Sequence, residues 1–144
     1  MKRAIPIIAL ASFLITVVFF SSCKRDKYED FVPYVPINIT KNINNPELVN
    51  LQSIGGWAYI NGGSKGLILY RKTENEINCF DRHSTYLPEN NCITKVDSNN
   101  INVLDPCSSS KWNLINGDPI GGEATRSLVS YETDFNGDRI TISN

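Results

Sequence analysis

The sequence predicts an all-β fold, a small antiparallel sandwich or barrel, for most of its 144 residues. Short segments rich in β-branched and aromatic residues recur at spacings of roughly 8–12 residues, separated by turns rich in Gly and Asn. The Asn-Gly pairs at 61–62 and 136–137 are typical of hairpin turns. Beyond residue 22, no window of about a dozen residues has the i, i+3, i+4, i+7 apolar spacing of an amphipathic helix.

The expected elements form one domain over residues 35–144. Segment 48–54 fits either a strand or a turn of helix, and segment 82–91 has so little β propensity that we expect a long functional or structural loop there. The remaining candidates are β-rich and bounded by turn residues. They lie at 35–40, 57–60, 67–70, 77–81, 93–96, 101–104, 128–133 and 139–143.

The N-terminus has the pattern of a secretory signal. A basic start at 2–3 precedes an apolar run at 4–20, and small residues follow before Cys23. The segment F-S-S-C at 20–23 resembles the lipobox of bacterial lipoproteins, in which the Cys becomes the lipid-modified first residue. This resemblance implies a signal peptide at 1–22 and firm anchoring through several acyl chains on Cys23. An uncleaved anchor helix is the alternative, since a 17-residue apolar run is near the lower limit for a membrane span.

Residues 23–34 begin with a charged stretch that has no hydrophobic pattern, and we expect a solvated tether there. By resemblance to Gram-negative sorting rules, Lys24 directly after Cys23 implies the outer membrane. Residues 23–144 carry 12 basic and 15 acidic side chains, a net charge of −3. This charge argues against a nucleic-acid-binding protein. The signal pattern and the lipobox resemblance together predict the cell envelope as the location, with the membrane as one partner and an envelope protein or ligand as another.

Three cysteines remain after Cys23, and an oxidising envelope favours their pairing. Cys79 lies in an apolar-alternating stretch, which is typical of a core residue, whereas Cys92 and Cys107 lie in turn-rich loops. We therefore favour a Cys92–Cys107 disulfide, which would contribute about 3 kcal/mol across a 15-residue separation. A bridge from Cys79, or three unpaired thiols, stays open as an alternative.

Two clusters of polar residues suggest other chemistry. Asp81, His83, Ser84 and Glu89 invite a hydrolase interpretation, but neighbours on one loop rarely assemble a nucleophile, a base and an orienting group. We predict instead that His83 is a loop residue bonded to the backbone. The D-x-N-G-D segment at 134–138 has the oxygen-rich spacing of a calcium loop but lacks the length and the distal Glu of an EF-hand, so we predict a plain hairpin turn.

Taken together, several segments resemble the Rieske-type ferredoxin domains of envelope lipoproteins. Over residues 48–143 their order and spacing follow that family. The N-terminal half of the resemblance is G-G-W-A-Y-I at 55–60, G-L-I-L-Y-R at 66–71 and C-F-D-R at 79–82. The second cluster-binding loop and the segment after it correspond to C-S-S-S-K-W-N-L at 107–114 and G-D-P-I-G-G-E-A at 117–124. The closing hairpin corresponds to the apolar positions around Asn136-Gly137.

The resemblance implies a fold whose metal ligands have been lost. Rieske domains hold a [2Fe–2S] cluster with two Cys and two His, written C-x-H in the first loop and C-x-x-H in the second. At the matching positions this chain has Ser84, Tyr86, Cys107 and Ser110. His83 is the only His and stands one residue before Ser84, so two imidazole ligands from one chain are excluded.

We therefore expect a lipid-anchored envelope protein with a Rieske-like domain, no metal and no cofactor, in a non-catalytic binding or scaffolding role. A Cys92–Cys107 bridge would tie the two loops together where relatives use the cluster. The alternative is an electron-transfer protein that keeps a [2Fe–2S] cluster, like the ferredoxin subunits of nitrite reductases or ring-hydroxylating dioxygenases. A hydrolase built around His83 is a third possibility.

Overall fold

The computed structural model describes residues 31–144. The predicted signal peptide at 1–22, Cys23 and the tether up to residue 30 lie outside the described residues. Across residues 31–144, no helix combines the length and the hydropathy needed to cross a membrane.

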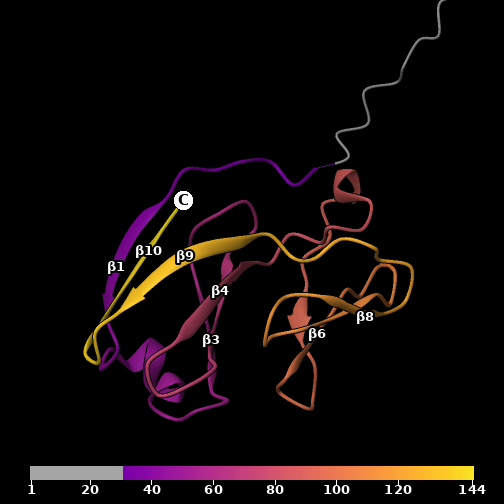
Figure 1. Cartoon of the computed structure of the whole chain (residues 1–144). Helices are drawn as coiled ribbons and strands as arrows, with labels where there is room; N and C mark the ends of the chain where they lie inside the picture. Colours follow the sequence, from indigo (N-terminus) through magenta and orange to yellow (C-terminus); the bar gives the residue numbers. More distant parts are fainter. Residues whose placement is uncertain (1–30) are drawn as a thin grey trace, which may run out of the picture.

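Two antiparallel sheets make up the fold, which confirms the predicted all-β class (Figure 1). The larger sheet has the strand order β1-β10-β9-β4-β3-β2, and the smaller has the order β5-β6-β7-β8. The whole smaller sheet is inserted in the chain between β4 and β9, which pair with each other in the larger sheet. The strands of the larger sheet are β1 (Asn38–Asn42), β2 (Trp57–Ile60), β3 (Leu67–Arg71), β4 (Ile77–Asp81), β9 (Ser130–Phe135) and β10 (Arg139–Ser143). Those of the smaller sheet are β5 (Lys95–Val96), β6 (Asn102–Leu104), β7 (Lys111–Asn113) and β8 (Pro119–Gly121).

Strand β3 lies between two hydrophobic cores. Leu67 and Leu69 belong to the core of the larger sheet, whereas Ile68 and Tyr70 pack into a second core with Trp112 of the smaller sheet. Successive side chains of a strand point to opposite faces, so this near-continuous apolar strand is buried on both sides. Burying one such aliphatic side chain stabilises the fold by about 1.5–3 kcal/mol. The strand thus joins the two sheets into one packed unit.

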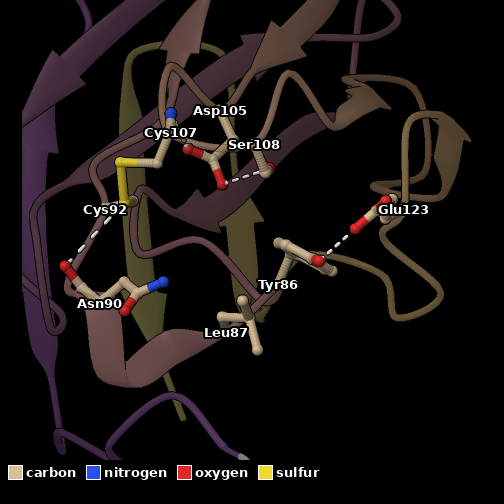
Figure 2. Close-up of a pocket in the computed structure, with 8 residues that line it drawn as sticks. All are labelled: Tyr86, Leu87, Asn90, Cys92, Asp105, Cys107, Ser108 and Glu123. Atoms are coloured by element: carbon tan, nitrogen blue, oxygen red, sulfur yellow. Dashed lines mark hydrogen bonds between the residues drawn. A yellow bond between two sulfur atoms is a disulfide. The ribbon is translucent and has the colours of Figure 1, made fainter.

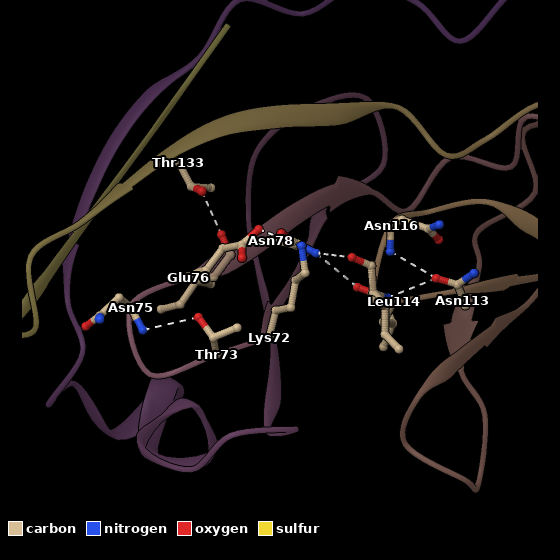
Figure 3. A network of polar contacts seen from close by, with 11 residues as sticks. Lys72, Thr73, Asn75, Glu76, Asn78, Asn113, Leu114, Asn116 and Thr133 are labelled. Atoms are coloured by element: carbon tan, nitrogen blue, oxygen red, sulfur yellow. Dashed lines mark hydrogen bonds and ion pairs between the residues drawn. The ribbon is translucent and has the colours of Figure 1, made fainter.

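A polar contact also ties β4 to the segment after β7. The amide nitrogen of Asn78 donates to the carbonyl oxygens of Leu114 at 3.3 Å and Ile115 at 2.7 Å, as Figure 3 shows in part. On the other side of β4, the Thr133 hydroxyl donates to the Ile77 carbonyl at 2.6 Å. These bonds satisfy backbone carbonyls where the ladders end.

Segment 48–54, for which the sequence left strand and helix open, lies mostly within a 3₁₀-helix, η2 (Pro46–Gln52). Pro46 stands at its start, where the missing N–H costs nothing. Its two buried residues, Leu48 and Leu51, are three positions apart. In a 3₁₀-helix with three residues per turn, both side chains therefore face the core.

Strands β7 and β8 were not among the predicted strands. Each has three residues, and the ladder between them shifts register next to Trp112. Trp112 is fully buried, so tertiary packing forms this strand where the local pattern is too short to show it. The hairpin predicted at Asn136-Gly137 is confirmed. Gly137 has φ +96°, and the Arg139 N–H donates to the Asn136 side-chain oxygen at 3.0 Å.

Candidate functional site

Two loops, at 82–94 and 105–110, are joined by a disulfide between Cys92 and Cys107. The two Cα atoms are 6.3 Å apart. The structure thus contains the disulfide that the sequence favoured. Cys79 is the free cysteine among residues 31–144, and it is buried in β4. Burial, and to a lesser degree the charge of Asp81, raises the pKa of its thiol, which suits an unreactive core residue.

The buried carboxylate of Asp105 connects the same two loops. Its Oδ1 accepts the backbone N–H of Cys107 at 2.8 Å, and its Oδ2 accepts the hydroxyls of Ser84 and Ser108, each at 2.8 Å. The first of these is an Asx turn, the local motif that Asp favours before a turn. A buried carboxylate is stable only when it is bonded in this way. Sequence reasoning missed Asp105, although the D-P-C-S run at 105–108 carries the turn signal.

A cavity of about 310 Å³ opens beside this carboxylate (Figure 2). Across it from Asp105 and Ser108, the Tyr86 hydroxyl donates to the Glu123 carboxylate. That hydrogen bond raises the pKa of Tyr86 above its ordinary value, since it holds the phenolic proton. The volume lies at the small end of the range for ligand pockets. The lining residues are Tyr86, Leu87, Asn90, Cys92, Asp105, Cys107, Ser108 and Glu123.

The four positions that the sequence singled out in these loops have different surroundings. Ser84 is buried and bonded to Asp105, and Tyr86 lines the cavity. Cys107 lines it too, with its sulfur in the disulfide. Ser110 is turned toward the 122–124 segment, where its hydroxyl oxygen accepts the N–H groups of Glu123 and Ala124 at 3.3 and 3.2 Å. The cavity-lining polar residues of the second loop are therefore Asp105 and Ser108.

His83 is not part of this cavity. Its Nε2 is 2.8 Å from the Pro88 carbonyl oxygen, and its Nδ1 is 2.8 Å from the Ser64 hydroxyl. A carbonyl oxygen only accepts, so Nε2 carries a proton, and in the neutral imidazole Nδ1 then accepts from the Ser64 hydroxyl. Pro88 opens the short 3₁₀-helix η3 (Pro88–Asn90) within the predicted 82–91 loop. The prediction that His83 is bonded to the backbone is confirmed.

The neighbouring Asp81 forms a second buried carboxylate network. Oδ2 accepts the Ser64 N–H at 2.6 Å and the Tyr131 hydroxyl at 3.0 Å, while Oδ1 accepts the N–H groups of Lys65 at 3.2 Å and His83 at 2.8 Å. Burial and the adjacent Asp81 charge raise the pKa of Tyr131. With its backbone N–H groups bonded to Asp81, the Ser64–Lys65 segment offers no oxyanion-binding donors beside the Ser64–His83 pair. This arrangement supports the turn after β2.

Comparison with solved structures supports the fold. The chain is similar to the crystal structure of the cyanobacterial plasma membrane Rieske protein PetC3 from Synechocystis PCC 6803, with a TM-score of 0.54 and 18% identity. The similarity covers 77% of this chain and 100% of that chain. No protein-family model and no curated protein sequence matches. The described domain therefore has a Rieske-like fold.

The side chains of these loops do not fit the cluster that this fold implies. A Rieske [2Fe–2S] cluster takes two thiolates and two imidazoles. The sulfurs of Cys92 and Cys107 are bonded to each other, and the chain's only His has both ring nitrogens engaged with Ser64 and Pro88. Cys79 lies in the core of the larger sheet. Hydroxyls and a carboxylate stand between the loops instead.

Proposed function

We propose that this protein is a lipid-anchored component of the bacterial cell envelope whose Rieske-like domain has lost its iron–sulfur cluster and serves a non-catalytic binding or scaffolding role. Cys23 would carry the lipid anchor, residues 23–34 would form the tether, and Lys24 favours the outer membrane. The binding surface would be the cavity between the two disulfide-linked loops, and its partner an envelope protein or ligand.

The main support for this proposal is the Asp105 network. In a cluster-bearing domain, metal binding itself helps to stabilise the loops that supply the ligands. In this chain one buried carboxylate accepts three hydrogen bonds from both loops, and a disulfide links the same loops covalently. Both cross-links hold the two loops together without a metal. The fold can therefore stay stable after the cluster-ligating side chains have been replaced.

An electron-transfer role is the alternative, and the Rieske-like fold is the observation that favours it. Electron transfer through this domain would need a cluster, so metal content separates the two candidates. We expect the protein, purified from iron-replete cells without added reductant, to contain background iron and to show no sulfur-to-iron charge-transfer absorption. A cluster-bearing Rieske protein expressed in parallel is the positive control. Two iron and two sulfide atoms per chain would overturn the proposal in favour of electron transfer.

The envelope anchor has a separate test. In cells fed an alkyne-tagged fatty acid, we expect the protein to carry the label and to fractionate with the outer membrane, because acylation of Cys23 holds it there. Cys23→Ser should lose both properties, whereas Cys79→Ala, which changes a buried thiol, should retain them. An unlabelled wild-type protein that keeps residues 1–22 would instead identify an uncleaved anchor helix.

A further inference from the structure

Three potential metal-ligand atoms lie together at the wall of the cavity. The sulfurs of Cys92 and Cys107 and a carboxylate oxygen of Asp105 are all within 4.8 Å of one another. In the disulfide form this group is closed to metals, because the thiolate and not the disulfide sulfur is the metal ligand. Opening the disulfide would therefore create donors at a place where a buried carboxylate already stands.

We propose that reduction of the Cys92–Cys107 disulfide converts this wall of the cavity into a binding site for a thiophilic divalent cation of the Zn²⁺ type. A dithiol supplies two electrons and two protons, so the protein disulfide becomes two thiols while the dithiol closes to its own disulfide. The cation then replaces the two thiol protons, which go to solvent, and binds the two thiolates and the Asp105 carboxylate.

The positions of the three donors do not depend on the sulfur–sulfur bond alone. The Cys92 carbonyl accepts the Ser84 N–H at 3.0 Å, and the Thr94 N–H donates to the Arg82 carbonyl at 2.7 Å, so the first loop is closed by its own backbone. Asp105 is held from both loops by Ser84, Ser108 and the Cys107 N–H. After reduction, the thiols need to separate only to the roughly 3.8 Å that two sulfurs adopt on one tetrahedral Zn²⁺.

Access and chemistry favour a soft cation. Cys107 is exposed, and both cysteines line the cavity of about 310 Å³, so a reductant, the ion and a water molecule as fourth ligand can enter. Glu123 on the opposite wall adds a second negative charge, and no Lys or Arg lines the cavity among the described residues. Two thiolates select Zn²⁺ over Mg²⁺ or Ca²⁺, which prefer all-oxygen sites.

The test uses Co²⁺ as an optical probe on the mature, detergent-solubilised protein under anaerobic conditions. After reduction with a phosphine, we expect one Co²⁺ per chain with thiolate-to-cobalt charge-transfer absorption, and its displacement by an equivalent of Zn²⁺. Before reduction we expect neither signal. Because reduction leaves the buried Cys79 thiol unchanged, the difference between the two states isolates the Cys92–Cys107 pair.

Variants assign the signal to the proposed residues. Cys92→Ser and Cys107→Ser should abolish the charge-transfer absorption in the reduced state, with folding checked by circular dichroism, whereas Cys79→Ala should leave it intact. The proposal is overturned if the reduced wild-type protein gives no charge-transfer band, a result that needs no variant to fold. It is equally overturned if the oxidised protein binds Co²⁺ as tightly, or if Cys79→Ala is the variant that loses the band. None of these outcomes bears on the iron content of the oxidised protein, which tests the proposed function separately.

Discussion

Replacing Asp81 by Asn is expected to lower the free energy of unfolding by about 3–5 kcal/mol, close to the largest effects of single substitutions. The carboxylate of Asp81 accepts four hydrogen bonds and is fully buried. An amide has one oxygen and one NH₂ group of similar size, so its NH₂ would face two of these donors. Each buried donor left unpaired costs roughly 1–3 kcal/mol.

Urea unfolding at neutral pH measures this effect. Asp134→Asn, the same chemical change on an exposed side chain of β9, is the matched control and should stay within about 0.5 kcal/mol of wild type. Tyr131→Phe removes a single donor to Asp81 and should fall between the two, at about 1–2 kcal/mol. Equal stability of Asp81→Asn and Asp134→Asn would show that the buried network contributes nothing to stability.

Loss of the disulfide is expected to cost about 3 kcal/mol, because the bridge closes a loop of 15 residues in the unfolded chain. The double variant Cys92→Ser/Cys107→Ser removes it without leaving a lone thiol in the loops. We expect its unfolding midpoint in urea to fall well below that of the oxidised wild-type protein. The Asp105 network persists in the variant, so the fold itself should survive.

Reduction provides the internal control for this prediction. A phosphine reductant should lower the midpoint of the wild-type protein to nearly that of the double variant, because exposed Cys107 makes the bridge accessible. The same reductant should leave the double variant unchanged. If oxidised and reduced wild-type protein unfold at the same urea concentration, the disulfide does not clamp the loops.

Several elements of the fold could be predicted because their signals are local. The predicted segments 57–60, 77–81 and 139–143 coincide with β2, β4 and β10, where short β-prone segments meet recognisable turns. The disulfide could also be predicted, because two cysteines in turn-rich loops can meet more readily than a pair in which one cysteine is fixed in a strand. Boundaries were less accurate. β1 begins three residues after the start of the predicted segment 35–40, and β9 begins two residues after the start of 128–133, because pairing between strands decides where a ladder starts.

The site was less predictable than the fold. Asp105 and Ser108 escaped attention because a carboxylate in a turn-rich stretch is ordinarily exposed, whereas in the structure Asp105 is fully buried and accepts the hydroxyls of Ser84 and Ser108. Ser110 drew attention by its spacing from Cys107, yet its hydroxyl binds the backbone of the 122–124 segment. Spacing along the chain does not reveal which way a loop side chain turns.

The amino-acid sequence by itself determined the all-β class, most strand positions and the absence of a second imidazole, because these follow from residue pattern and count. Only the tertiary structure decided that Asp81 and Asp105 are buried hubs, that β7 and β8 are strands, and that a cavity lies beside the disulfide. The physical reason is the distance along the chain over which each signal acts. Pattern and turn chemistry act over a few residues, whereas burial of a polar group and the shape of a cavity depend on partners brought together from distant parts of the chain.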